Sequence, residues 1–224
     1  MNFLSHYYFD RLNTDANIVM GIVLPDLVKN ASKESNLYPQ KNEFLFKGNT
    51  DEEALLAGWK KHLAVDLLFH SSEFFLEKTT ALKHLIVPVV ENTHVRPSFL
   101  AHIGLELLLD HLLIEHNLVQ VNQFYDSLNA VNKDSLSDFL AHCNFKSPEV
   151  FFRFLEQFIS SKYLLSYQKL ENVSYALNRI CMRLWPETLN EQQLAELTYQ
   201  LGLFKEILEK DFMTIFNQID AQLT

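Results

Sequence analysis

Apolar residues recur at helical spacing along most of this chain, and the clearest case is the stretch 99–116, FLAHIGLELLLDHLLIEH. Its leucine and isoleucine residues lie three or four positions apart, which is the spacing of one face of an α-helix. No proline interrupts the stretch, and Ser98 precedes it as a candidate N-cap. Because so few of its side chains are polar, we expect a central and largely buried helix.

The same spacing predicts further helices on both sides of this stretch. They are expected at residues 2–12, 16–31, 50–72, 73–85, 118–130, 135–142, 149–165, 167–185 and 191–223. Gly202 is a candidate break in the last of these, and the polar segment 32–48 is expected to be a loop. The chain has no internal repeat and no change of composition along its length. We therefore predict one all-α domain over residues 1–224, a single-domain bundle of about eight helices.

The composition of the 224-residue chain, with 48% hydrophobic residues and only 5 Gly, is that of a packed globular protein. Its formal net charge of −9 argues against nucleic-acid binding, which normally needs an excess of basic residues. Cys143 and Cys181 form no CxxC pair and are typical of thiols in a reducing compartment. The first residues do not resemble a signal peptide, and no run of about 18 apolar residues is present. We predict a cytoplasmic protein that does not enter a membrane.

Two of the predicted helices carry His and carboxylate side chains at successive turns. In the stretch 99–116 these are His102, Glu106 and Asp110. In the stretch 50–72 they are His62, Asp66 and His70. Such groups on a buried helix need a partner or a bound cation, and helical bundles build metal sites from side chains that face inward. The alternative is that both columns are ordinary polar residues of amphipathic helices.

Four segments resemble the acyl carrier protein phosphodiesterase family, which is related to the HD-domain phosphohydrolases. The opening MNFLSH is close to the opening MNFLAH of that family, and Gly21–Asp26 resembles its Gly-Asn-x-x-x-Asp segment. Gly58–His70 resembles its Gly-x-x-x-His-x-x-x-Asp-x-x-x-Asp helix. Glu106–His116 resembles its Asp-x-x-x-Asp-His-x-Leu-x-x-His helix. Tyr167–Arg183 and Leu208–Phe216 match the family weakly, in the spacing of their apolar residues, so the likeness spans nearly the whole chain.

This resemblance implies an HD-domain-like fold and metal-dependent release of 4′-phosphopantetheine from acyl carrier protein, with Mn²⁺ as the expected cofactor. The implied metal ligands are His6, His62, Asp66, His70, Glu106 and Asp110. Asp26 and His111 are the expected catalytic residues, which would take a proton or orient a water molecule. Lys60, Lys61 and Arg96 are expected to bind the phosphate charge. A divalent cation would polarise the phosphoryl oxygens and lower the pKa of a bound water.

Three positions depart from the family pattern. Ile22 stands where the family has Asn, and His70 and Glu106 each stand where it has Asp. Imidazole and carboxylate groups both bind divalent cations, so His70 and Glu106 keep the ability to hold a metal. The side chain of Ile22 cannot replace an amide. The resemblance therefore identifies a divergent relative.

The charge of the chain bears on the expected partner. Acyl carrier proteins are acidic, so a chain with a net charge of −9 needs a local basic patch to bind one. The densest candidates are Lys60, Lys61, Lys78 and Lys83. Two other functions remain open at this point. One is a non-catalytic helical bundle that binds a metal or a small molecule, and the other is an HD-like phosphohydrolase that acts on a small phosphoester.

Overall fold

Helices account for the regular secondary structure of the computed structural model, which describes residues 1–223, and this range contains no strand. The prediction of an all-α fold is therefore confirmed. The first helices are α1 (Phe3–Tyr8), α2 (Ala16–Ala31), α3 (Thr50–His70), α4 (Glu73–Ile86), α5 (Pro97–Glu115) and α6 (Val121–Asn129). They are followed by α7 (Lys133–His142), α8 (Pro148–Ser161), α9 (Leu170–Cys181), α10 (Glu191–Leu208) and α11 (Met213–Leu223). Three short 3₁₀-helices, η1 (Pro39–Lys41), η2 (Glu43–Phe46) and η3 (Tyr163–Gln168), connect some of them.

The described residues form more helices than the predicted number of about eight, and the boundary predicted between the stretches 149–165 and 167–185 is present. Lys162 adopts a positive φ of 47° and ends α8. The 3₁₀-helix η3 then separates α8 from α9. At the C-terminus, the break lies between Leu208 and Met213, whereas Gly202 lies inside α10. The prediction that Gly202 divides this stretch was therefore wrong.

Asparagine ends two of the helices in a chain that has few glycines. Asn117 and Asn144 follow the C-caps of α5 and α7 with φ values of 55° and 57°. In α5 the N–H of Asn117 donates to the carbonyl of Ile114, and the N–H of Leu118 donates to the carbonyl of Leu113. This pair of bonds is a Schellman motif, and Asn is the residue besides Gly that best tolerates the left-handed conformation it needs.

The described chain divides into two compact units, and each is built from separate segments. Unit 1 comprises residues 1–5, 67–118 and 164–224, although residue 224 lies outside the described range. Unit 2 comprises residues 6–66 and 119–163. Helices α1 and α3 therefore each contribute residues to both units. The single-domain assignment over residues 1–224 stays a prediction.

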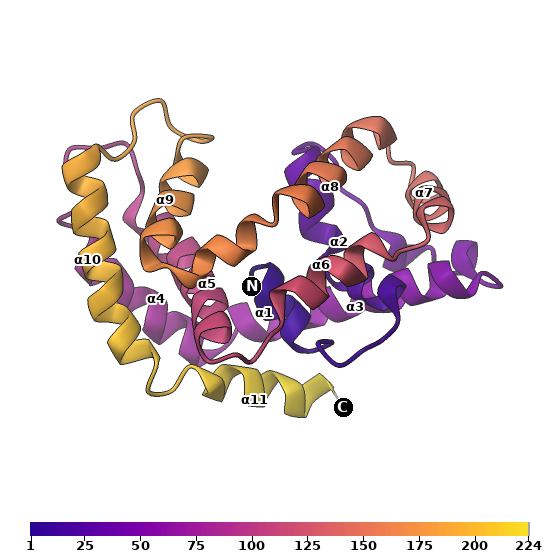
Figure 1. The fold of residues 1–224 in the computed structure, drawn as a ribbon, viewed down its shortest axis with the longest axis horizontal. Coiled ribbons are helices and arrows are strands. Elements are labelled where there is room, and N and C mark those ends of the chain that lie inside the picture. Colours follow the sequence, from indigo (N-terminus) through magenta and orange to yellow (C-terminus); the bar gives the residue numbers. More distant parts are fainter. Residues whose placement is uncertain (224) are drawn as a thin grey trace. The chain divides into compact units, whose positions relative to one another are not determined.

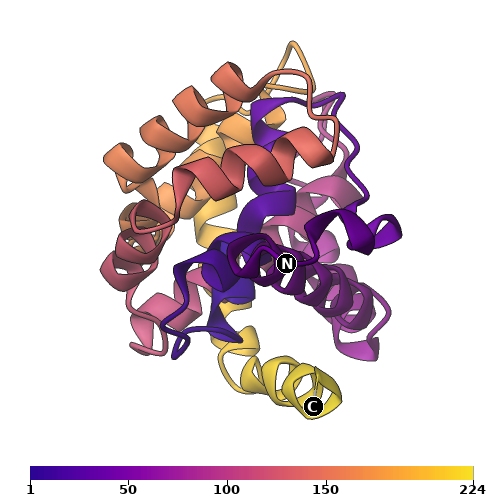
Figure 2. The same cartoon turned by 90° about the vertical axis from the view of Figure 1, so that its right-hand side faces the viewer.

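Unit 1 is organised around α5, which packs against α4 and α9, while α10 contacts α4, α5 and α9 (Figures 1 and 2). Arg96 occupies the N-cap position of α5 and Pro97 its first turn, so the prediction that Ser98 is the N-cap was wrong. Most of α5 is buried, as predicted. By length and composition alone, α5 is also apolar enough to cross a membrane, with 67% of the tested window buried inside the structure. A buried core helix of a water-soluble protein has the same properties.

Unit 2 holds α2 against α6 and α8, and α2 also approaches α3 closely (Figure 1). The approach depends on two glycines. A Cβ atom on Gly21 would lie 2.3 Å from the carbonyl oxygen of Leu55, and one on Gly58 would lie 2.4 Å from that of Ile18. Both distances are far below van der Waals contact, so these positions exclude any larger residue unless the helices separate. The glycines thereby bring the backbone of α2 next to the side chains of α3.

The two cysteines are free thiols, as expected from their spacing. Cys181 is buried and Cys143 is half-buried. Burial raises the pKa of Cys181 to about 11, and burial together with the nearby Glu52 raises the pKa of Cys143 to about 12. Neither thiol is therefore ionised at neutral pH, and neither is activated as a nucleophile.

Candidate active site

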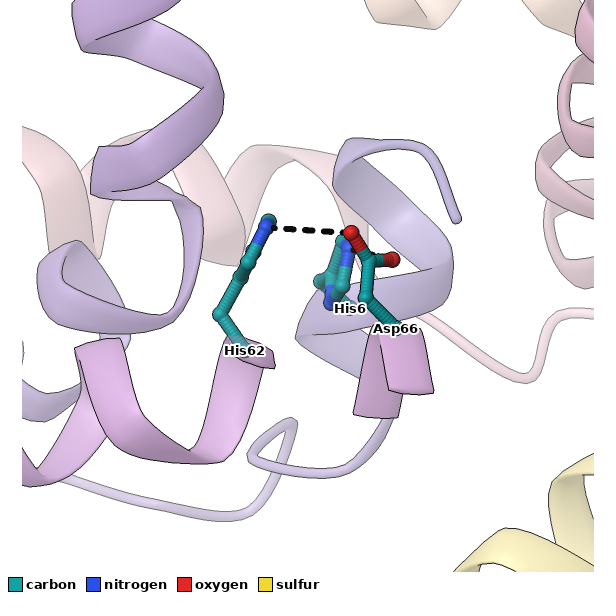
Figure 3. A group of neighbouring side chains, drawn as sticks. All are labelled: His6, His62 and Asp66. Carbon is teal, nitrogen blue, oxygen red and sulfur yellow. Dashed lines mark ion pairs between the residues drawn. The ribbon is translucent and has the colours of Figure 1, made fainter. Parts of the chain in front are cut away.

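Three of the predicted metal ligands meet in unit 2. His6 comes from α1, while His62 and Asp66 lie one turn apart on α3, and the three side chains point toward one another (Figure 3). His6 Nε2 lies 3.3 Å from Asp66 Oδ1, and His62 Nε2 lies 3.6 Å from Asp66 Oδ2. The two imidazole rings stack with their centroids 3.8 Å apart. One ligand atom from each residue therefore lies within 4.8 Å of the others.

A backbone carbonyl sets the tautomer of His62. The Nδ1 atom of His62 lies 2.8 Å from the carbonyl oxygen of Ile22 on α2. A carbonyl oxygen can only accept, so Nδ1 carries the proton and Nε2 carries the lone pair that points toward Asp66. This contact uses the main chain of Ile22, and its side chain plays no part in it. The exchange of Asn for Ile at this position therefore leaves the orientation of His62 intact.

His6 is fully buried, and neither of its ring nitrogens has a hydrogen-bond partner. Burial, followed by the neighbouring His62, lowers the pKa of His6 to about 4. Its imidazole is therefore neutral at neutral pH. For Asp66, burial opposes ionisation, but the contact with His6 and the charges nearby outweigh it and hold the pKa well below its usual range. The group thus offers a neutral imidazole from His6, the imidazole of His62 and one carboxylate.

These residues fit a divalent metal ion. Two imidazole nitrogens and a carboxylate oxygen form a donor set used by first-row divalent metals. The two histidine Nε2 atoms lie 3.3 and 3.6 Å from different oxygens of Asp66. One ligand atom from each of the three residues lies within 4.8 Å of the others, which is close enough for one ion to contact all three after small side-chain adjustments. Such an ion would also give a partner to the buried Nε2 of His6, whereas Nδ1 would stay without one among residues 1–223. The side chain of Asp66 is 34% exposed, so one side of the group is open to solvent.

Two other predicted ligands, His70 and Glu106, lie in a second group in unit 1. Their third member is His102, which stands one turn before Glu106 on α5. His102 belongs to the column that the sequence shows, but it was not predicted as a ligand. Its spacing from Glu106 was the signal that could have identified it.

Asp110, the sixth predicted ligand, is fully buried and belongs to neither group. Its Oδ1 accepts from the N–H and the hydroxyl of Ser5, and its Oδ2 accepts from the N–H of Leu4 and the amide of Asn2. These four bonds occupy the lone pairs of the carboxylate and fix the N-terminal segment on α5. Burial raises the pKa of Asp110 to about 6 in spite of them. Metal binding by Asp110 stays a prediction, and it requires that some of these bonds be released.

The two predicted catalytic residues occupy different environments. His111 on α5 is buried, and its Nδ1 donates to the carbonyl of Tyr167 over 2.7 Å. Its Nε2 has no hydrogen-bond partner in the described part of the chain, and the nearest carboxylate oxygen given for it, Glu115 Oε2, lies 3.7 Å away. Asp26 follows Pro25 within α2, which continues through the proline, and its side chain is half-buried. The roles of both residues stay predictions.

The comparison with protein families agrees with the segments that carry these residues. The model of the family described as acyl carrier protein phosphodiesterase matches residues 1–219 of the 224. The chain belongs to this family. No match is found among curated proteins or among solved structures. The relation to the HD-domain fold therefore stays a prediction.

The basic residues predicted to bind phosphate or acyl carrier protein are largely engaged within the chain. Lys60 pairs with Glu43 at 2.8 Å, and Lys61 pairs with Asp10 at 2.9 Å. Lys78 was expected to contribute to a basic patch, but it is buried and pairs with Asp211 at 2.6 Å. That expectation was wrong, because a buried and neutralised lysine presents no charge to a partner. Arg96 lies at the start of α5 and lines a shallow hollow of about 510 Å³.

Proposed function

We propose that this member of the acyl carrier protein phosphodiesterase family is an active metal-dependent hydrolase that releases 4′-phosphopantetheine from holo-acyl carrier protein. The observation that carries the proposal is the group His6, His62 and Asp66. It lies within the matched residues, its imidazoles present lone pairs to a common centre, and its donor set suits a divalent cation. We further propose Mn²⁺ as the cation, because a mixed nitrogen and carboxylate set accepts it.

Each residue of the group has a distinct task in this proposal. His62 is oriented by the carbonyl of Ile22, so its Nε2 is the atom that would bind the ion. Burial keeps His6 neutral, so His6 binds without first losing a proton. Asp66 supplies negative charge on the exposed side of the group, where a phosphodiester would enter. The bound cation supplies Lewis acidity toward a phosphoryl oxygen and acidity to a water molecule.

Proton transfer is assigned to His111 or Asp26, the two residues that the family resemblance indicates. His111 is held in a fixed orientation for this role, because its Nδ1 donates to the carbonyl of Tyr167 and leaves Nε2 as the nitrogen that can exchange a proton. Asp26 would act as a carboxylate base. Removing the base lowers turnover and leaves metal binding intact, whereas removing His62 lowers both.

The experiment is an assay of purified protein with holo-acyl carrier protein and Mn²⁺, in which mass spectrometry detects the apo product. We expect apo product with the wild type and a loss of at least about 100-fold with His62→Ala, because general acid–base and metal roles each contribute about 10²–10⁴. His94→Ala is the matched control, since His94 is an exposed histidine paired only with Glu187 on the surface. Equal activity of the wild type and His62→Ala would contradict the assignment of the site.

A second substrate class is favoured by one observation. The chain carries a net charge of −9, and the lysines nearest to the metal-binding turn of α3, Lys60 and Lys61, are already paired with carboxylates. An acidic protein is therefore repelled over long distances, whereas a small phosphodiester is repelled much less. Turnover of a small aryl phosphodiester at a rate above that of holo-acyl carrier protein would favour this alternative.

A further inference from the structure

The second histidine group, which consists of His70, His102 and Glu106, has a geometry that ordinary hydrogen bonding does not explain. His70 Nε2 lies 3.1 Å from His102 Nε2 and 3.3 Å from Glu106 Oε1. His102 Nε2 lies 3.1 Å from the same Oε1. The three atoms therefore form a nearly equilateral triangle, and each is close to both of the others.

Protons cannot satisfy all three edges of this triangle. Each Nε2 atom carries at most one proton, and that proton points along one direction only. If both histidines donate to Glu106, their two N–H groups lie side by side with the nitrogens only 3.1 Å apart. If one donates to the other, its contact with Glu106 has no proton. A single cation at the centre satisfies all three atoms at once.

The edge lengths match such a cation. Zinc binds imidazole nitrogen at about 2.0–2.1 Å and carboxylate oxygen at about 2.0–2.2 Å, so tetrahedral ligand atoms lie roughly 3.3–3.5 Å apart. One observed edge, of 3.3 Å, lies at the lower bound of that range, and the other two, of 3.1 Å, lie 0.2 Å below it, so a bound ion would move the three atoms slightly apart. Two imidazoles and a glutamate are the ligand set of several catalytic zinc sites, in which water takes the fourth position.

The surroundings leave room for that fourth ligand and hold the other three in place. The ring of Phe75 lies edge-on to both imidazoles, with centroids 5.0 Å from His70 and 4.9 Å from His102. The side chain of Glu106 is 11% exposed, whereas those of His70 and His102 are 33% and 38% exposed. His102 also lines the hollow that contains Arg96 and Trp185. The group is thus closed on the Glu106 side and open on the histidine side.

The charge state of Glu106 agrees with cation binding. Burial opposes its ionisation, but the amino group of Met1, 3.2 Å from Oε1, and the two histidines outweigh this and hold the pKa of Glu106 below its usual range. The carboxylate is therefore ionised at neutral pH. The same Oε1 is paired with the ammonium group of Met1, so a divalent cation would replace that group as the partner of the carboxylate.

We propose that His70, His102 and Glu106 bind a Zn²⁺ ion, with a water molecule in the fourth position facing the hollow beside Arg96. This site shares no residue with the group His6, His62 and Asp66 and goes beyond the proposed phosphodiesterase function. A zinc ion with three protein ligands and a water molecule in the fourth position can exchange that water for a small anion.

The test is the zinc content of the full-length protein after equilibration with Zn²⁺ and removal of excess metal. We expect His102→Ala to lose one equivalent relative to the wild type and to weaken zinc binding at that site by more than about 100-fold. The loss of a single ligand should exceed the 10–100-fold effect of an outer-shell residue. His94→Ala is the control and should retain all of the zinc. Circular dichroism of His102→Ala establishes that the exposed position tolerates alanine.

A second measurement identifies the ligands. Co²⁺ in place of Zn²⁺ gives visible absorption of tetrahedral type, and this band should be reduced by Glu106→Gln and by His102→Ala. The same zinc content in the wild type and in His102→Ala would overturn the proposal. A loss of metal in His62→Ala without any loss in His102→Ala would overturn it as well and leave the proposed phosphodiesterase site standing. A loss of metal in His102→Ala without any loss in His62→Ala would support the zinc site and contradict the phosphodiesterase site.

Discussion

The substitution Gly58→Ala probes the link between helix packing and the geometry of the candidate active site. The added Cβ atom would lie 2.4 Å from the carbonyl oxygen of Ile18, 2.7 Å from the N of Ile22 and 2.8 Å from the carbonyl carbon of Gly21. All three are backbone atoms of α2, so no flexible side chain can move aside. Ordinary contact begins at 3.4 Å, so α2 and α3 must separate by about 1 Å.

This separation affects both stability and His62. Overpacking of a core contact costs about 1–3 kcal/mol of unfolding free energy. A shift of about 1 Å lengthens the contact between His62 Nδ1 and the carbonyl of Ile22 from 2.8 Å to a value beyond hydrogen-bonding range. The loss of that buried bond costs about 1–3 kcal/mol more. Alanine recovers about 1 kcal/mol through its better helix propensity, so the net destabilisation is about 1–5 kcal/mol.

The assay combines urea unfolding with metal titration. We expect the unfolding midpoint of Gly58→Ala to fall and its affinity for Mn²⁺ to drop about 10–100-fold, because His62 loses the partner that orients it. Gly202→Ala is the matched control, since its nearest neighbour is a side-chain atom of Leu170 at 3.5 Å. It should be neutral or stabilise by up to about 1 kcal/mol. A Gly58→Ala protein with unchanged stability and affinity would refute the close approach of α2 and α3 and the role of Ile22.

Three further predictions concern buried charge. Asp110→Asn should destabilise the protein by about 1–3 kcal/mol. The NH₂ group of the new asparagine must face one of the N–H groups that now donate to the carboxylate, so two donors oppose each other. Equal unfolding midpoints of wild type and variant would contradict this. The pKa of His6 is about 4 in the folded protein, below the value of 6.5 expected in the unfolded chain. The neutral ring therefore makes its full contribution to the free energy of unfolding above about pH 6.5, and this contribution falls as the pH drops toward about 4. The stability advantage of the wild type over His6→Asn should therefore shrink by about 3 kcal/mol between pH 7 and pH 4, and a constant difference would exclude the shift. Lys78→Ala should destabilise the protein by about 1–3 kcal/mol, because Lys78 is buried and hydrogen-bonded to Asp211, which is 44% exposed and keeps its hydration when the lysine is lost. The exposed Lys133→Ala should change the unfolding free energy by under about 1 kcal/mol, and equal effects of the two substitutions would contradict this.

The long helices and the identity of the ligand residues could be predicted from the sequence, because both depend on periodicity along one segment. The leucine spacing of residues 99–116 identified α5. The two metal-ligand groups contain five residues that were predicted as ligands: the His and carboxylate columns supplied His62, Asp66, His70 and Glu106, and the family resemblance supplied His6. His102 was recognised as part of a column but not as a ligand.

The sequence did not show that the residues of one column would contact different parts of the structure. Residues four apart on a helix are rotated by about 40°, and residues eight apart by about 80°. His62 and Asp66 therefore share one direction, while His70 points away from His62 and joins His102 and Glu106. In the same way, the side chain of Asp110 points in a different direction from that of His102, and it accepts hydrogen bonds from the backbone N–H groups of Leu4 and Ser5. A helix face that looks continuous in sequence is divided by this drift.

Contacts made by the main chain left no signal in the sequence at all. The carbonyls of Ile22 and Tyr167 set the tautomers of His62 and His111, and neither side chain indicates this role. The approach that allows the first contact depends on Gly21 and Gly58, which the sequence presents as two isolated glycines in predicted helices. Only the packing of α2 on α3 relates them to the site.

The most direct test of the central claim is the intact mass of holo-acyl carrier protein after incubation with this protein and Mn²⁺, with and without a chelator. If His6, His62 and Asp66 form a hydrolytic metal site, the substrate loses its 4′-phosphopantetheine group only when the metal is present, and His62→Ala leaves the mass unchanged. Full conversion by His62→Ala, or an unchanged mass with metal-loaded wild type, would contradict the account.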